Sequence, residues 1–310
     1  MLFILHIGFS KCASTFLRSI FRTHPDINLL PKSFYFSPFN IYKGDDHKSY
    51  KNLISEYLNP EKTNIESDEH ILLPDIHPKL KVRATTLKSL EQSFKDIKRE
   101  ISNVKIFFVI RNHASLLLSR YSEYILNGGD CSFEEFFKQL VSSNDLNEGG
   151  FFQNYYYQIY NMLIDIFGKE NVIFLIQELI TKEKSAEIDK LFNFLKVARI
   201  ETNKINFINR RVGLSLISLN LLRRFNICFV KEIEQYKKPM NTRVPLFLYK
   251  LFIRSLRVID YYLIKNFSTS KGKLLKEELS DELRQKFGMD NRKLSEQVCV
   301  DLSQYGYFLE

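Results

Sequence analysis

The sequence has few cysteines, the residues that can cross-link a fold or bind a structural metal. Its 310 residues include four cysteines, Cys12, Cys131, Cys228 and Cys299, which lie far apart and form no C-x-x-C pair. This spacing predicts neither a zinc site nor a disulfide framework, and free thiols in a reducing compartment are the simplest interpretation. No internal repeat or low-complexity tract is present, so nothing predicts a repeat architecture.

Long uncharged apolar runs are also missing. The N-terminal "MLFILHIG" has no basic residues ahead of its apolar run, which is too short for a signal peptide or a membrane span. The apolar stretch 245–267 is interrupted by five charged residues, Lys250, Arg254, Arg257, Asp260 and Lys265, and is not expected to cross a bilayer. We therefore expect a cytoplasmic protein.

The composition allows a large folded domain with a basic surface. A chain that is 45% hydrophobic can bury a full core, and its length fits one α/β domain with an elaborated C-terminal part. Its net charge of +9 favours an anionic ligand, nucleic acid or a membrane surface, without choosing among them.

Apolar runs at 2–7, 103–111 and 171–176 are rich in β-branched and aromatic residues and predict buried parallel strands. A helical pattern follows each of the first two runs, and "TTLKSLEQSFKDIKREI" precedes the second. Alternating strands and helices predict an α/β fold, a doubly wound parallel sheet flanked by helices. Within 40–80 we expect long loops and one short strand near "NIES".

Helix boundaries are marked in the middle of the chain. Ser132 and Glu135 form an S-x-x-E capping box ahead of "FFKQL", and Gly128 and Gly129 end the preceding helix. Beyond about residue 205 the pattern predicts a largely helical C-terminal part.

The stretch "HIGFSKCASTFLRSIFRTHP", residues 6 to 25, predicts an anion-binding loop. A strand ending at Gly8 and a helix starting near Ser14 point backbone N–H groups and the positive helix end at the turn, where Lys11 adds a charge. The Walker A pattern requires Gly-Lys followed directly by Ser or Thr. Lys11 instead comes three residues before the first hydroxyl, which disfavours an ATP site.

These residues resemble the 5′-phosphosulfate-binding loop of the sulfotransferases, G-x-P-K-x-G-T-T-x-L followed by H-P. In two places the chain departs from that pattern: Ser10 stands for Pro, and Ala13 stands for Gly. Ala13 is compatible with the loop if its position does not require a positive φ. The resemblance implies binding of 3′-phosphoadenosine 5′-phosphosulfate by Gly8, Ser10, Lys11, Cys12, Ala13, Ser14, Thr15 and Phe16.

A second stretch, "KIFFVIRNHASLLLSRYSEY", resembles the family's 3′-phosphate site, a strand ending in Arg with a Ser eight residues later. Arg111 and Ser119 keep that spacing, while His113 replaces the usual Pro. An Arg at a strand's carboxyl end and a Ser on the next helix can converge on one phosphate. Arg211, like its neighbour Arg210 and Arg243, is a weaker candidate from a late loop.

Weaker similarities lie in "IFGKENVIFLIQELI", "LFNFLKV" and the C-terminal "DNRKLSEQVCVDLSQYGY". Together they imply a single domain over 1–310 with the P-loop NTPase-like sulfotransferase architecture. We divide it into a core of about 1–200, a helical elaboration of about 205–288 and a C-terminal segment, 289–310.

The resemblance implies transfer of a sulfuryl group to a hydroxyl or amine without a metal, with Lys11 stabilising the leaving phosphate. A saccharide or glycolipid is the expected acceptor. A hydroxyl acceptor needs a general base. Ser33 stands where many carbohydrate sulfotransferases carry Glu after Lys32, so the base must lie elsewhere. Glu66 is the first substitute, and Glu69, His70 and His77 follow.

Two other functions stay open: a P-loop-type ATP-dependent kinase, and a noncatalytic basic protein that binds membrane or nucleic acid. We expect no nucleic-acid partner, and the sequence predicts no oligomeric state. Lys250, Arg254 and Arg257 share one helical face, which fits peripheral contact of 245–267 with the inner face of a membrane or with an acidic acceptor. A core-packed helix with a solvated basic stripe is the interpretation that we favour.

Four further side chains have simple interpretations. His6, within an apolar strand, is expected to be a satisfied core histidine. Tyrosines 155–157 fit stacking on a nucleotide or a sugar and fit core packing equally well.

Overall fold

The computed structural model describes residues 2–31, 55–68, 71–72, 87–141, 155–182, 184–200, 213–232, 241–264 and 274–310. Its centre is a parallel sheet in the order β2-β3-β1-β4-β5. The strands are β1 (Phe3–His6), β2 (Ile27–Leu29), β3 (Thr63–Ser67), β4 (Val104–Ile110) and β5 (Val172–Ile176). A separate antiparallel pair joins β6 (Val230–Glu232) and β7 (Asn241–Thr242).

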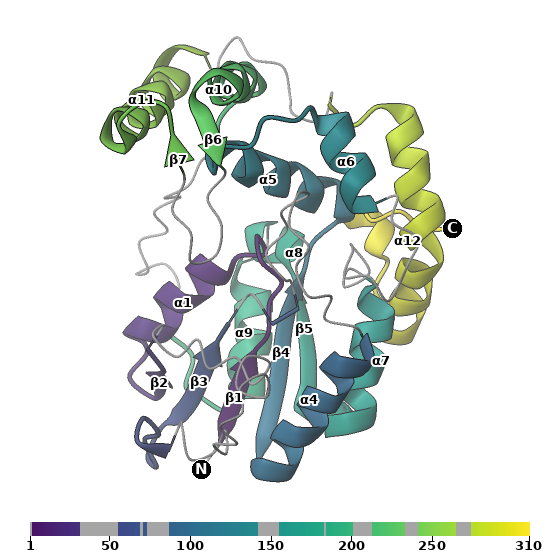
Figure 1. The fold of residues 1–310 in the computed structure, drawn as a ribbon. Coiled ribbons are helices and arrows are strands. Elements are labelled where there is room, and N and C mark those ends of the chain that lie inside the picture. The colour runs from purple at the N-terminus through teal and green to yellow at the C-terminus, as the bar shows by residue number, and fades with distance from the viewer. Residues whose placement is uncertain are drawn as a thin grey trace.

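Helices cover both faces of the sheet and build a further layer beyond its carboxyl edge (Figure 1). They are α1 (Ser14–Thr23), α4 (Leu87–Glu100), α5 (His113–Leu126), α6 (Phe133–Val141), α7 (Tyr156–Phe167), α8 (Gln177–Lys182), α9 (Lys184–Leu195), α10 (Leu216–Phe229), α11 (Leu246–Ile259) and α12 (Glu277–Val298). Short turns are η2 (Lys169–Asn171), the π-helical η4 (Asp260–Ile264) and η6 (Leu302–Tyr305).

Apolar and polar residues do not alternate along β4, because both faces of this strand are buried. Successive side chains of a strand point to opposite faces. Phe107 packs edge-on against Phe21 of α1, whereas Phe108 contacts Tyr160 of α7 on the other face. Both phenylalanines are fully buried because helices cover each face.

The predicted α/β class is confirmed, and the predicted strands appear as β1, β3, β4 and β5. The sequence did not predict β2, β6 or β7, which are two or three residues long and too short for a periodic pattern. In β2, Asn28 interrupts the apolar run, and its amide donates to the Asn64 side chain over 2.7 Å.

The predicted helix boundaries are confirmed as well. The Glu135 N–H donates to Ser132 Oγ over 3.2 Å, and the Ser132 N–H donates to a Glu135 carboxylate oxygen over 2.7 Å. This reciprocal pair is the capping box of α6. The helix before it, α5, ends at Leu126, and Gly128 follows with a φ of 97°.

The outer helical layer is fixed to the rest of the protein by buried polar contacts. The Asn226 amide of α10 donates to the carbonyls of Ile125 and Gly129 over 2.8 and 2.7 Å. The Tyr249 hydroxyl of α11 donates to Asn226 Oδ1 over 2.8 Å. Asp260 accepts hydrogen bonds from the hydroxyls of Ser215 and Ser218 at the start of α10. These contacts join α10, α11 and the C-terminal end of α5 into one unit.

Within the residues that the structure describes, no helix has both the length and the apolar character needed to cross a bilayer.

Candidate functional site

The turn between β1 and α1 uses backbone conformations that few residues adopt. Gly8 has a φ of 125°, a region open mainly to glycine. Lys11 and Ala13 also have positive φ values, 67° and 57°. The chain is thereby wound tightly over the carboxyl end of β1, with the first turn of α1 directly after it.

The structure corrects the expectation for Ala13. The sequence interpretation required that this position not need a positive φ, yet Ala13 lies in the left-handed region as the residue preceding α1. The loop therefore forms with Ala in a conformation that suits Gly, at a cost on the order of 1 kcal/mol. Ala13 also packs against the core, which offsets part of that cost.

The first turn of α1 offers an anion several favourable groups. N–H groups of the first turn of a helix have no acceptor within the helix, and the helix end is electropositive. No acidic residue stands in the first turn of α1. Ser14 is buried, Thr15 is exposed, and Phe16 packs against the core. These features fit an anion-binding turn.

The two halves of the predicted donor site meet at Lys11. The Arg111 guanidinium, just beyond the end of β4, donates to the Lys11 carbonyl over 3.0 Å. Ser119 is half-buried on α5, one helical turn before Glu123, so the two side chains share a face of the helix. The Glu123 carboxylate lies 2.5 Å from Lys11 Nζ. Arg111 therefore contacts Lys11, and Ser119 lies one helical turn from the Glu123 that pairs with Lys11.

Sequence reasoning missed Glu123. Its signal was available, since it follows Ser119 by four residues in a predicted helix and so lies on the same face. The Lys11 and Glu123 side chains are 22% and 43% exposed, so their attraction is screened by water. Such a pair contributes on the order of 1 kcal/mol or less and exchanges readily for another anion.

Arg120 is a second residue that sequence reasoning missed. It lies next to Ser119 but is only 5% exposed. Burial lowers the pKa of Arg120 to about 10, while the nearby Tyr156, Cys12 and Glu123 act to raise it. At pH 7 the guanidinium therefore keeps its charge. Because Cys12 belongs to the loop, this is a buried positive charge close to the candidate anion site.

Hydrogen bonds from other elements fix the corner between β4 and α5, which carries Arg111. Asn112 caps α5, its side chain accepting the Ser115 N–H over 2.9 Å. The Asn112 amide group also donates to Glu178 over 2.8 Å and to the Tyr305 carbonyl over 3.2 Å. The Tyr156 hydroxyl donates to the Arg111 carbonyl over 2.7 Å. The C-terminal segment and α8 thus help to position Arg111.

His113 fills the space that the resemblance assigns to Pro. Its ring is fully buried and stacks on Phe287 at 4.1 Å and on Tyr156 at 4.8 Å between centroids. Helix α5 begins normally because Asn112 caps it, which was the condition for this replacement.

Glu66 is the one described member of the base candidates. It is the penultimate residue of β3, paired in register with Leu5 of β1, and only 3% exposed. It lies at the carboxyl edge of the sheet, where β1 leads into the loop. Glu69, His70, His77, Arg210 and Arg211 lie outside the described residues. Arg243 is exposed and donates to the Cys228 carbonyl over 3.2 Å.

The remaining candidates have structural roles. His6 is fully buried, 2.8 Å from Ser67 Oγ and stacked on Phe107, so the core interpretation is confirmed. Tyr156 is also fully buried, which makes it a core residue. Tyr155 is half-buried against Phe287. Cys12 is buried as a free thiol.

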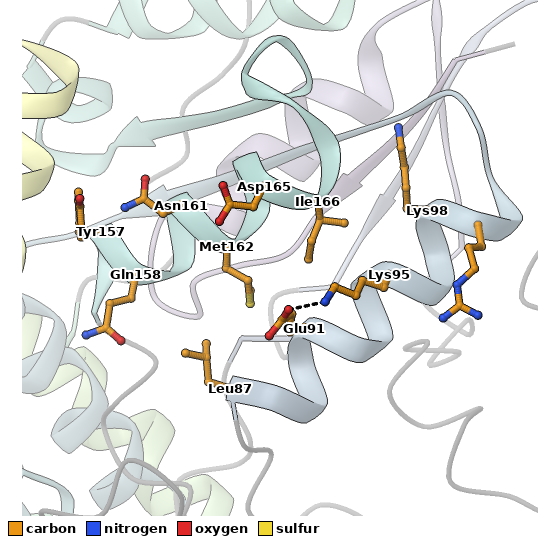
Figure 2. Close-up of a pocket in the computed structure, with 11 residues that line it drawn as sticks. Leu87, Glu91, Lys95, Lys98, Tyr157, Gln158, Asn161, Met162, Asp165 and Ile166 are labelled. Atoms are coloured by element: carbon orange, nitrogen blue, oxygen red, sulfur yellow. Dashed lines mark hydrogen bonds and ion pairs between the residues drawn. The ribbon is translucent and has the colours of Figure 1, made fainter.

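A cleft of about 800 Å³ lies between α4 and α7 and does not coincide with this site. Figure 2 shows side chains of the two helices around it, with the Glu91–Lys95 ion pair on α4. Its lining includes Tyr157 of α7 but none of the loop residues and neither Arg111 nor Ser119. We therefore place the candidate site at the loop, on the strength of its charged groups.

No family model and no curated protein matches this chain. Among solved structures, it is similar to a sulfotransferase from Alicyclobacillus acidocaldarius, with a TM-score of 0.57, 15% identity and 99% of both chains covered. The sulfotransferase domain from the curacin biosynthetic pathway gives a TM-score of 0.42 and 12% identity over 97% of this chain and 98% of that one. Mouse sulfotransferase SULT7A1 complexed with PAP gives a TM-score of 0.40 and 14% identity, over 66% of this chain and 62% of that one.

The first of these similarities is close enough to compare folds. This chain has the α/β fold of a sulfotransferase, with a five-stranded parallel sheet flanked by helices. The similarity to the Alicyclobacillus acidocaldarius sulfotransferase covers 99% of this chain.

Proposed function

We propose that this protein transfers a sulfuryl group from 3′-phosphoadenosine 5′-phosphosulfate to a hydroxyl or amine of an acceptor. The supporting observation is the 3.0 Å hydrogen bond from Arg111 to the Lys11 carbonyl. It joins the two motifs whose resemblance implies binding of opposite ends of one donor. The sulfotransferase fold of the chain supports the same conclusion.

The charges around the loop fit a donor that carries several negative groups. Lys11, Arg111 and the buried Arg120 are cationic, and the first turn of α1 has no acidic residue. Glu123 is the acidic neighbour of Lys11, and its half-exposed carboxylate can turn away into water. In this proposal the loop holds the phosphosulfate, and Arg111 with Ser119 holds the 3′-phosphate.

In the proposed reaction, the bond between sulfur and the bridging oxygen breaks while a bond forms between sulfur and the oxygen or nitrogen of the acceptor. Negative charge grows on the leaving phosphate oxygen. Lys11 and the N–H groups of the turn stabilise that charge because they are held in place before the reaction. The acceptor proton must pass to a base within hydrogen-bonding distance.

We propose Glu66 for that base, since it lies at the carboxyl edge of the sheet and is almost fully buried. Replacing Glu66 with Gln should lower kcat by about 10²-fold or more while the affinity for the donor nucleotide changes little. Steady-state kinetics across pH, with direct titration of adenosine 3′,5′-bisphosphate, measure both. A Glu66→Gln enzyme with normal kcat would move the role to one of Glu69, His70 and His77.

The acceptor that we propose is a saccharide or a glycolipid. Supplying a donor with labelled sulfate and partitioning the product between organic solvent and water separates the two. Label confined to a protein or nucleic-acid fraction would contradict both.

Binding of the product nucleotide is the experiment that tests the proposed function. Adenosine 3′,5′-bisphosphate at about 100 times its Kd should stabilise the folded protein by about 2.7 kcal/mol. A thermal-shift titration measures this stabilisation. ATP with Mg²⁺ should give a much smaller effect, because Lys11 does not stand in a Walker A pattern.

Lys196→Ala is a matched control for Lys11→Ala, because both lysines have a positive φ, 56° and 67°. The Lys11→Ala protein should lose most of the shift, whereas Lys196→Ala should keep it. Stabilisation by ATP and Mg²⁺ alone would favour the kinase instead. No stabilisation by either nucleotide would leave the noncatalytic interpretation.

A further inference from the structure

The described residues expose their large apolar side chains in one region. All but Met289 of these side chains lie on α10, α11 and η4. Phe247 and Tyr262 are each 69% exposed, and Leu263 is 62% exposed. An apolar surface concentrated in this way marks a site of interaction with a partner or a membrane.

Helix α11 is not the core-packed helix that the sequence favoured. Its buried residues are Tyr249 and Leu256, seven apart and hence on one face. At 3.6 residues per turn, Phe247, Leu251 and Val258 fall on the opposite face, which points away from the protein. These three side chains are 55% to 69% exposed.

Helix α10 repeats this arrangement. Leu219, Leu222 and Asn226 are buried, while Ile217 and Leu221 on the opposite face are 42% and 46% exposed. The two helices pack together, with Phe225 stacked on Phe252 at 4.3 Å. They form the outermost layer of the molecule beyond α5 (Figure 1). We call the outward faces of α10, α11 and η4 the α10–α11 surface.

The charges on the α10–α11 surface are of one sign. Lys250, Arg254 and Arg257 are exposed on α11, beside the apolar face, and Arg224 is exposed on α10. Asp260, the acidic residue of α11 and η4, is 4% exposed and bonded to Ser215. Asp260 is the sole acidic residue of α10, α11 and η4, so these three described elements expose no acidic side chain.

We propose that the α10–α11 surface docks on an anionic lipid bilayer, with both helices lying in its interface. Apolar side chains enter the headgroup boundary while flanking lysines and arginines bind lipid phosphates. The exposed Tyr261 and Tyr262 at the end of α11 suit the same boundary, where aromatic rings with one polar end concentrate.

A bilayer fits this surface better than a second copy of the chain does. A two-fold interface brings the same patch of both subunits together. Lys250, Arg254 and Arg257 would then face their own copies, and α10, α11 and η4 offer them no exposed acid to pair with, which is unfavourable. Anionic headgroups supply the missing negative charge. The proposal does not depend on sulfuryl transfer, since it concerns binding alone.

Vesicle sedimentation with the full chain tests the proposal. Wild-type protein should bind vesicles of phosphatidylglycerol and phosphatidylcholine, and it should bind much less to vesicles of phosphatidylcholine alone. Its binding to the anionic vesicles should weaken as the salt concentration rises. Lys250→Glu with Arg254→Glu should weaken binding roughly 25-fold or more, at about fivefold for each basic residue lost.

The matched control is Arg22→Glu with Lys88→Glu, two exposed residues on α1 and α4. This pair lowers the net charge by the same amount and should keep most of the binding. An equal loss of vesicle binding in both double variants would mean that net charge alone binds lipid. That result would overturn the proposal.

The absence of tryptophan from the sequence allows an insertion probe. Phe247→Trp and Met289→Trp each place a single tryptophan at an exposed apolar position, 69% and 58% exposed. With anionic vesicles the emission should shift to shorter wavelength at position 247 and stay unchanged at 289. Unchanged emission at both positions would overturn the proposal. So would a stable dimer in sedimentation velocity that Phe247→Ser with Leu251→Ser dissociates.

Discussion

Lys11 has different partners for its backbone and its side chain. Its carbonyl accepts the Arg111 hydrogen bond, and its ammonium group pairs with Glu123 at 2.5 Å. The backbone contact involves a half-buried guanidinium and fixes the loop to the end of β4. The side-chain contact is partly exposed and therefore weak. Lys11 is thus held in place while its charge remains available to an anion.

Replacing Glu123 with Gln removes the carboxylate that competes for Lys11. The affinity for adenosine 3′,5′-bisphosphate should rise about two- to fivefold, the equivalent of a weak surface ion pair. Isothermal titration calorimetry measures the change. Glu91→Gln is the matched control, because Glu91 pairs with Lys95 at the same 2.5 Å distance on α4. The affinity of this variant for the nucleotide should equal that of the wild type. A weaker complex with Glu123→Gln would mean that Glu123 assists binding.

Ala13 stores a local strain that glycine would relieve. Ala13→Gly should raise the free energy of unfolding by about 1 kcal/mol, because the residue has a φ of 57°. Urea unfolding measures the change. Ala186→Gly on α9, at an exposed position, should lower stability by about 0.5–1 kcal/mol. Equal losses in both variants would show that the packing of the Ala13 methyl group outweighs its backbone strain.

At the scale of elements, α12 supports α7 through a carboxylate. Asp290 accepts the N–H groups of Tyr157 and Gln158, at 2.9 and 3.4 Å, in the first turn of α7. Asp290 is 7% exposed, and burial raises its pKa to about 6, although these hydrogen bonds and Lys293 act to lower it. The C-terminal helix therefore caps an element whose own N-cap, Tyr155, has no capping side chain.

This pKa makes part of the stability depend on pH. Because the folded-state pKa lies above the ordinary value of 3.8, the native protein holds a proton that the unfolded chain releases between about pH 4 and 6. The contribution of Asp290 is largest below pH 4 and is lost as the pH rises through about 6, on the order of 2–3 kcal/mol in all.

Asp290→Asn should remove this dependence. From pH 4 to 6, the unfolding free energy of the wild type should fall relative to that of Asp290→Asn. Above about pH 6 the difference between the two proteins should become constant. Urea titrations at several pH values measure it. Asp165→Asn, an exposed carboxylate on α7, controls for the loss of a charge. A constant difference for Asp290→Asn across this range would contradict the prediction.

Elements with strong local signals were predictable. β1, β4 and β5 are predominantly apolar runs, and the Ser132–Glu135 box marks the start of α6. The three-residue β2 carries no such signal, because its formation depends on pairing with β3. The role of α12 as the cap of α7 was equally invisible, since Asp290 and Tyr157 are distant in sequence.

At the scale of the whole molecule, two separate regions carry the positive charges on which the proposals depend. One is the loop region with Lys11, Arg111 and the buried Arg120. The other is the α10–α11 surface. Helix α5 connects them, carrying Arg120 and Glu123 near the loop and contacting Asn226 of α10 at its C-terminal end. We propose that the first region binds a small anion and that the second binds a lipid surface.

The sequence by itself determined the α/β class, and it predicted both the anion-binding character of the loop after β1 and the pairing of Arg111 with Ser119. These follow from local patterns, namely apolar runs, a strand-to-helix turn and a fixed spacing on one helix. The tertiary structure decided which distant groups meet: Glu123 with Lys11, Arg120 with Cys12 of the loop, and Asp290 with the start of α7. It also decided that the outer faces of α10 and α11 stay exposed. Burial and contact depend on how elements pack, and a helix pattern states which residues share a face but not what covers that face.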